Sequence, residues 1–188
     1  RDEIKQNILQ NFGVCKPYDE NAYSDGEVTK KTKQDIGKKF SQNSFLFSVR
    51  KLNPDYIGHI FWENSLRYVN GPTPVLSKKI NKTGVFFNSS IEDIYDKIDE
   101  HNLNCVQLHG EESPEFCKEI MDKGIRVIKS FRIDDNFDFI VLNKYQENCN
   151  LFLFDSKSDL PGGTGKSFNW SNLKKYNLKK EFFISGGI

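Results

Sequence analysis

The sequence predicts a parallel α/β fold of the (β/α)8 TIM-barrel class, built as a single domain over all 188 residues. From about residue 55 onward, short runs of β-branched or aromatic residues alternate with amphipathic or turn-rich segments, which is typical of βα units. The runs start roughly every 20 to 30 residues, and eight units of that spacing need roughly 200 residues. The chain therefore has about the length of a small barrel.

Six strands are expected, and each is a short run rich in apolar side chains. They are residues 56–62, 83–88, 105–110, 126–132, 151–156 and 182–187. Between them, residues 90–100 carry apolar side chains at helical spacing, and Ser90 with Asp93 imitates a capping box. A second helix is expected from Ser113, with proline in its first turn, to about Gly124.

Residues 16–44 break this pattern, because they are polar, rich in lysine and asparagine, and without a sustained apolar period. We interpret this segment as a loop insertion. Its charges nearly balance, which favours a solvated loop over a nucleic-acid-binding arm.

The overall composition excludes several classes of protein. With 27 Lys+Arg against 26 Asp+Glu, the net charge is +1, which offers no broad attraction for nucleic acid or a membrane surface. The sequence has neither an apolar run long enough for a membrane span nor a signal peptide, so a cytoplasmic protein is expected. Its four cysteines include no CxxC pair, so neither a zinc site nor a disulfide framework is indicated.

In parallel βα folds, functional residues gather where the strands end. Asp155 follows the apolar run 151–154, so desolvation favours its protonated form, which can act as a general acid. The alternative is a structural Asp that caps the following loop. The segment 161–167 ends like a nucleotide P-loop, but Leu160 stands where that motif needs its first glycine. Its glycines indicate either close backbone approach to a ligand or a flexible turn.

Four more residues are candidates for substrate binding. Gly186 and Gly187 end a strand with bare backbone, whose N–H groups suit a phosphate, although such a pair can equally mark a bend. Arg67 lies in a loop after a strand and suits a carboxylate, although surface arginines are equally common. His109 lies at a strand end. It is either a group that titrates near neutral pH or a hydrogen-bonded residue of the scaffold.

Five blocks of sequence carry a family resemblance. The clearest is VQLHGEE at 106–112, and the others are residues 55–69, 84–88, Asp155 with 162–170, and 185–187. In this order and spacing they resemble the phosphoribosylanthranilate isomerase family of tryptophan biosynthesis over about residues 51–188. The resemblance implies a (β/α)8 barrel in which strands 2 to 7 are visible and strands 1 and 8 are missing from the chain.

The same resemblance implies an Amadori rearrangement of N-(5-phosphoribosyl)anthranilate to 1-(2-carboxyphenylamino)-1-deoxyribulose 5-phosphate, without metal or organic cofactor. Asp155 matches the general acid. Arg67 would hold the anthranilate carboxylate, His109 would contact the substrate, and Gly186 and Gly187 would bind its phosphate.

One departure from the family pattern concerns the general base, which in the family is a cysteine in a Lys-Ile/Val-Cys-Gly strand. No such block occurs here, and Cys15 lies too far along the chain to replace it. We therefore expect this chain to be truncated at both ends and to be inactive by itself. Residues 16–44 would then be an insertion in its first βα unit. Fusion to, or association with, other tryptophan-pathway enzymes stays open.

Two other functions are compatible with these residues. One is a different phosphosugar enzyme on the same barrel, which would not need Arg67 as a carboxylate clamp. The other is an inactive barrel remnant that binds a partner protein through residues 16–44.

Overall fold

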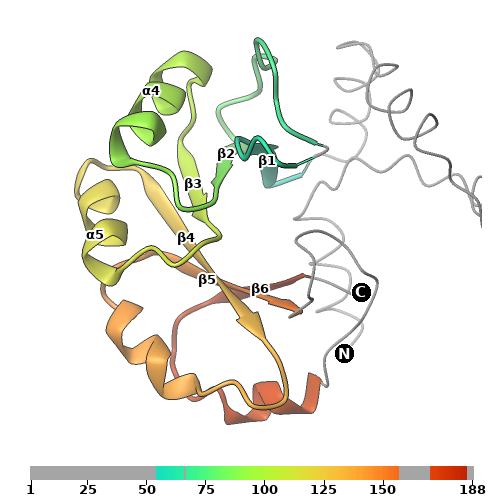
Figure 1. Ribbon diagram of the computed structural model, residues 1–188, viewed down its shortest axis with the longest axis vertical. Coiled ribbons are helices and arrows are strands. Elements are labelled where there is room, and N and C mark those ends of the chain that lie inside the picture. The colour runs from blue at the N-terminus through green and yellow to red at the C-terminus, as the bar shows by residue number, and fades with distance from the viewer. Residues whose placement is uncertain (1–53, 66, 157–169, 186–188) are drawn as a thin grey trace, which may run out of the picture.

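The computed structural model describes residues 54–65, 67–156 and 170–185, and within them six parallel strands form one sheet in the order β1-β2-β3-β4-β5-β6. Each strand pairs with its neighbour in the sequence, and the sheet curves around an open side (Figure 1). The strands are β1 (Tyr56–Ile60), β2 (Asn81–Phe86), β3 (Cys105–Leu108), β4 (Arg126–Ile133), β5 (Leu151–Ser156) and β6 (Phe182–Ser185). All six predicted strands are confirmed within a few residues of their expected ends.

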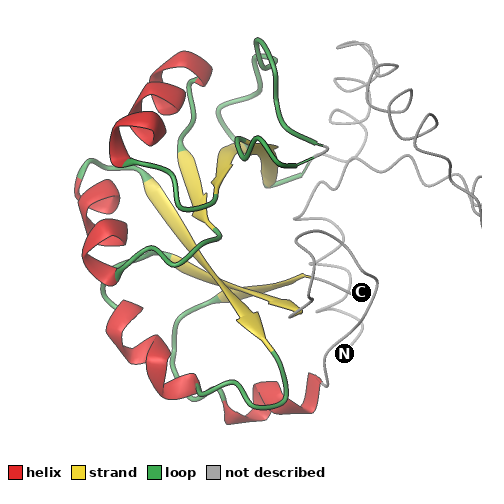
Figure 2. Cartoon of the chain, in the orientation of Figure 1, coloured by secondary structure: helices red, strands yellow, loops and turns green. Residues whose placement is uncertain are grey.

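The helices lie on the convex side of the sheet (Figure 2). They are α4 (Ile91–His101), α5 (Pro114–Asp122) and the 3-10 helices η2 (Phe139–Tyr145) and η3 (Trp170–Lys175). The predicted helix starts are confirmed, because the Ser90 hydroxyl accepts the backbone N–H of Asp93 and the Ser113 hydroxyl that of Phe116. No helix in the described part of the chain is long and apolar enough to cross a membrane.

The expectation of an eight-stranded barrel lacking its first and last strands is wrong for this structure. The described residues form a half-barrel of six strands, in which β1 and β6 are the two edges. Strand spacing along the sequence predicts which strands are neighbours and that they run parallel, but closure depends on hydrogen bonds between strands remote in sequence. The spacing of the apolar runs therefore predicted these six strands correctly, but it does not establish an eight-stranded barrel. The predicted insertion, residues 16–44, lies outside the described residues.

Alternation along the strands gives the sheet two different faces. The convex face packs against the helices through a large apolar cluster that includes Ile94, Leu108, Ile120 and Phe152. A smaller cluster, Cys105, Ile128, Leu151 and Leu153, lies on the concave face. The convex side chains are almost fully buried, and each such aliphatic or aromatic side chain contributes roughly 1.5–3 kcal/mol to folding. This packing fixes the positions of the strand ends.

Candidate active site

Two of the residues predicted from sequence meet at the carboxyl ends of β3 and β5. The ring of His109 places Nε2 3.3 Å from Oδ2 of Asp155. The other carboxylate oxygen of Asp155, Oδ1, accepts a hydrogen bond of 2.8 Å from the hydroxyl of Ser185, its register partner on β6. Both ring and carboxylate stay about a quarter exposed, with 23% and 27% of their side-chain surface open. They are therefore accessible to a ligand on the concave side.

Gln107 extends this group of side chains along β3. Its Nε2 lies 3.0 Å from Nδ1 of His109, two residues further on and on the same face of the strand. Only 7% of the surface of Gln107 is exposed, so this side chain is buried. Gln107 belongs to the sequence block at 106–112, but no role was predicted for it, although strand alternation predicts that Gln107 and His109 share a face.

Arg132 brings a positive charge to the same face. It pairs in register with Asp155 and is exposed, and its guanidinium lies 5.4 Å from the centroid of the Phe87 ring. Among the described residues no carboxylate forms an ion pair with it. The register with Asp155 thus places Arg132 on the concave side.

Lys129 points to the opposite face and is buried. Its ammonium lies 2.9 Å from Oε2 of Glu112 and donates to the carbonyl of Gly110 at 2.6 Å. The Glu112 carboxylate also accepts the backbone N–H groups of Asn88 and Gly110. This cluster joins the loops that follow β2 and β3, and thereby fixes the backbone beside His109.

Close packing of these loops leaves no room for a side chain at Gly110. A Cβ atom there would lie 2.1 Å from Oδ1 of Asn88, whose φ of 51° is itself left-handed. That same Oδ1 accepts the backbone N–H of Glu111 at 2.7 Å. The glycine after His109 is thus required by the approach of two loops.

Of the remaining predicted site residues, Arg67 lies within the described ranges. Arg67 is exposed in the connection between β1 and β2, where Tyr68 bridges back to Ile60 beside the end of β1. Gly186, Gly187 and the glycine loop at 161–167 lie outside the described residues. Gly186 follows Ser185, the hydrogen-bond partner of Asp155, directly in sequence.

The described thiols are unsuited to act as bases. Cys105, Cys117 and Cys149 are free and buried. Burial raises the pKa of Cys105 to about 11, of Cys117 to about 12 and of Cys149 to about 11. Cys15 lies outside the described residues. Within the ranges that the structure covers, no group of three or more His, Cys, Asp or Glu side chains is placed to hold a metal.

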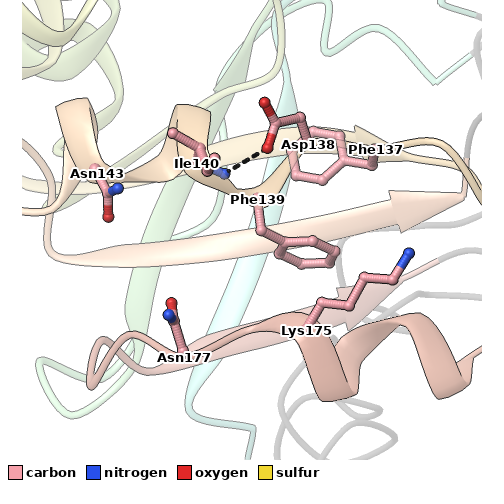
Figure 3. A pocket seen from close by; sticks show the side chains of 7 residues that line it. All are labelled: Phe137, Asp138, Phe139, Ile140, Asn143, Lys175 and Asn177. Carbon is pink, nitrogen blue, oxygen red and sulfur yellow. Dashed lines mark hydrogen bonds between the residues drawn. The ribbon is translucent and has the colours of Figure 1, made fainter.

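One surface hollow, of about 360 Å³, lies between η2 and the segment around Lys175 and Asn177, and Phe137 and Phe139 line it (Figure 3). Asp138 there accepts the backbone N–H of Ile140, which starts η2. The chemistry-bearing side chains are instead on the open concave face of the sheet.

Comparison with known proteins gives a consistent result. The family model for N-(5'-phosphoribosyl)anthranilate (PRA) isomerase matches residues 38–188. An N-(5'-phosphoribosyl)anthranilate isomerase of Phocaeicola vulgatus is 38% identical over 141 residues, covering 75% of this chain and 69% of that protein. The same enzyme of Parabacteroides distasonis is 40% identical over 148 residues, covering 74% of this chain and 66% of that protein.

Solved structures agree with these relatives. The phosphoribosyl anthranilate isomerase of Thermotoga maritima superposes with a TM-score of 0.67 at 32% identity, covering 79% of this chain and 73% of that one. A further phosphoribosyl anthranilate isomerase structure holds reduced 1-(o-carboxyphenylamino)-1-deoxyribulose 5-phosphate and superposes with a TM-score of 0.63 at 30% identity. It covers 79% of this chain and 72% of that chain.

Proposed function

The chain belongs to the N-(5'-phosphoribosyl)anthranilate isomerase family, an isomerase family of tryptophan biosynthesis, and we propose that its Asp155 supplies the general acid of that reaction. The observation that carries the proposal is the contact between Asp155, His109 and Ser185 on the concave face. The family match decides against the alternative of a different phosphosugar enzyme.

The proposed reaction opens the furanose ring of N-(5'-phosphoribosyl)anthranilate and moves a carbonyl group. A proton passes to the ring oxygen, the bond from that oxygen to C1 breaks, and an imine forms between C1 and the anthranilate nitrogen. A base then removes the proton from C2 while the imine nitrogen takes up a proton, which gives an enol with a double bond between C1 and C2. The enol gains a proton at C1 and loses the proton of its C2 hydroxyl to give the ketose. Only protons move, so the reaction needs neither metal nor redox cofactor.

The partners of Asp155 suit this role. Ser185 and His109 contact different oxygens of the carboxylate, so the group is oriented while part of it stays open to a substrate. The Nε2 atom of His109 lies 3.3 Å from Oδ2 of Asp155, so the ring lies directly beside the proposed acid. In this proposal His109 acts beside the acid and contacts the substrate.

The substrate's two anionic groups need separate binding sites. We assign the anthranilate carboxylate to Arg67, which suits a carboxylate and follows β1 at the sheet edge where the strands end. We assign the phosphate to the backbone N–H groups of Gly186 and Gly187, which follow Ser185 in sequence.

None of the three described thiols can supply the general base, because each has a raised pKa and is buried among apolar side chains. Because no Lys-Ile/Val-Cys-Gly block occurs in the sequence either, we propose that the 188-residue polypeptide alone isomerises the substrate very slowly. We propose a cytoplasmic enzyme of tryptophan biosynthesis, and association with other enzymes of that pathway is part of the same proposal. Measurable turnover by residues 1–188 would contradict the expectation of slow catalysis.

Replacing Asp155 by Asn in the complete gene product tests the acid. Loss of phosphoribosylanthranilate fluorescence measures the rate, and we expect Asp155→Asn to lower it by roughly 10²–10⁴-fold, the usual contribution of general acid catalysis. Asp99→Asn is the matched control, because Asp99 is exposed on α4, outside the group of side chains around Asp155. Equal rates in the two variants would refute the assignment of Asp155.

A further inference from the structure

Gln107, His109 and Asp155 form a continuous row of contacts whose hydrogen positions can be worked out from chemistry. A glutamine amide nitrogen donates hydrogen bonds and cannot accept them. The Nε2 atom of Gln107 lies 3.0 Å from Nδ1 of His109, so Nδ1 must be the acceptor and carries no hydrogen. A neutral imidazole with bare Nδ1 has its hydrogen on Nε2.

The Nε2 atom of His109 is the one that faces Asp155, at 3.3 Å from Oδ2. We propose that Gln107 is a positioning residue, which selects the tautomer of His109 and so directs an N–H group at the carboxylate of Asp155. For its catalytic consequence, this inference rests on the proposed function of Asp155. The tautomer itself follows from the contacts of His109.

Both ends of the Gln107–His109 contact are held in place. Gln107 lies in an interior strand, with Val85 and Ile128 as its register neighbours on β2 and β4. The backbone N–H of His109 donates to the carbonyl of Phe86 at 2.9 Å. Because strand pairing fixes both backbones and only 7% of Gln107 is exposed, its amide has little freedom to move away from the ring.

The tautomer matters because Asp155 is held at both oxygens. Ser185 donates to Oδ1, and a hydrogen on Nε2 of His109 completes the pair at Oδ2. If the hydrogen moved to Nδ1, a lone pair would face the carboxylate and the second donor would be lost. The carboxyl group would then be held less firmly in the orientation that faces the substrate's ring oxygen.

Nitrogen-15 NMR of the complete gene product tests the proposal directly, because long-range ¹H–¹⁵N spectra identify which ring nitrogen of a histidine bears hydrogen. The chain contains three histidines, and His109→Asn identifies the signals of the ring in question. We expect Nε2–H in the unaltered protein at mildly alkaline pH. We expect Gln107→Leu to give a mixture of the two tautomers, because leucine is similar in size to glutamine but has no hydrogen-bond donor. Gln146→Leu is the matched control. Gln146 lies at the C-terminal end of η2, away from the site, so this variant should leave the His109 spectrum unchanged.

Gln107→Glu reverses the polarity of the contact. A carboxylate cannot donate a hydrogen bond but accepts one from Nδ1–H, so we expect the ring of His109 to carry hydrogen on Nδ1 in this variant. Hydrogen on Nδ1 in the unaltered protein, or an unchanged His109 spectrum in Gln107→Leu, would overturn the proposal.

Kinetics separates positioning from folding. We expect Gln107→Leu to lower kcat about tenfold, a part of the roughly 10²–10⁴-fold that general acid catalysis supplies, and to change KM less than about twofold. A rise in KM with unchanged kcat would assign Gln107 to substrate binding and contradict a positioning role. If Asp155→Asn retained full activity, the proposed acid would fail, whereas the NMR spectra would still decide the tautomer of His109.

Discussion

Two pairs of a basic side chain and a carboxylate lie on opposite faces of the same part of the sheet. On the concave face, His109 and Asp155 are 3.3 Å apart, with 23% and 27% of their side chains exposed. On the convex face, Lys129 and Glu112 are 2.9 Å apart, with only 2% and 3% exposed. The two pairs differ in how many of their hydrogen-bond donors and acceptors already have a partner in the protein.

The convex pair has no capacity left for a ligand. Lys129 also donates to the carbonyl of Gly110, and Glu112 accepts from two backbone N–H groups as well as from Lys129. The concave pair is held by Gln107 and Ser185 but keeps an open side. Burial with saturated partners marks a structural pair, whereas partial exposure with oriented partners marks a group that can act on a substrate.

Replacing Lys129 should give the largest loss of stability. Lys129→Met leaves the Glu112 carboxylate buried without its cation, and we expect the free energy of unfolding to fall by about 3–5 kcal/mol. Asp155→Asn, on the exposed concave pair, should change it by less than about 1 kcal/mol. Urea unfolding followed by circular dichroism measures both, and similar losses would erase the distinction between the two pairs.

A double variant sharpens that test. Combining Lys129→Met with Glu112→Gln removes both charges, while the amide oxygen of the introduced glutamine can still accept from the backbone of Asn88 or Gly110. We expect part of the stability lost in the single variant to return, because the uncompensated charge is gone. A double variant no more stable than Lys129→Met would show that geometry, rather than charge, dominates.

Acid should weaken the convex face through His59. Burial, with the nearby charge of Lys82, lowers the pKa of His59 to about 4 from its ordinary 6.5. As the pH drops, His59 is protonated in the unfolded chain near pH 6.5 but in the folded protein only near pH 4. The free energy of unfolding therefore falls between these two pH values, by roughly 3 kcal/mol for this group. Urea unfolding at several pH values across this window measures the fall, and His59→Gln should flatten it. An equally steep fall in that variant would assign the effect to other groups.

Ser185→Ala should have a smaller effect, confined to the concave pair. Losing one hydrogen bond to Asp155 is worth about 1 kcal/mol, or roughly a fivefold fall in kcat, with the unfolding free energy little altered. Ser185→Thr keeps the hydroxyl and should restore most of the rate. If the Thr and Ala variants lost the same activity, the bond between Ser185 and Asp155 would not matter to the reaction.

The smallest effect is expected where an ion pair is fully solvated. Lys118 and Asp122 on α5 are 2.9 Å apart, with 51% and 57% of their side chains exposed. Lys118→Ala should change the unfolding free energy by less than about 0.5 kcal/mol. The same urea assay measures it, and a loss near that of Lys129→Met would show that burial does not separate these pairs.

Local patterns predicted much of this fold. The apolar runs located all six strands, and Ser90 and Ser113 marked the helix starts because their hydroxyls accept N–H groups within the next few residues. The strand-end rule also selected His109 and Asp155, which the structure brings together. The expected eight-stranded barrel lacking its first and last strands was wrong, because the strand number of a barrel depends on pairing between strands distant in sequence rather than on any local signal.

The sequence by itself determined the elements, their order and the edge at which polar side chains gather, since those depend on residue types a few positions apart. Only the tertiary structure decided that Lys129 is buried beside Glu112 while Arg132, three residues later, faces the open side with Asp155. It likewise placed Gln107 and Ser185 beside the candidate acid. A shift of one residue in strand register would turn each of these side chains to the other face, so register, set by packing of the whole sheet, makes the site.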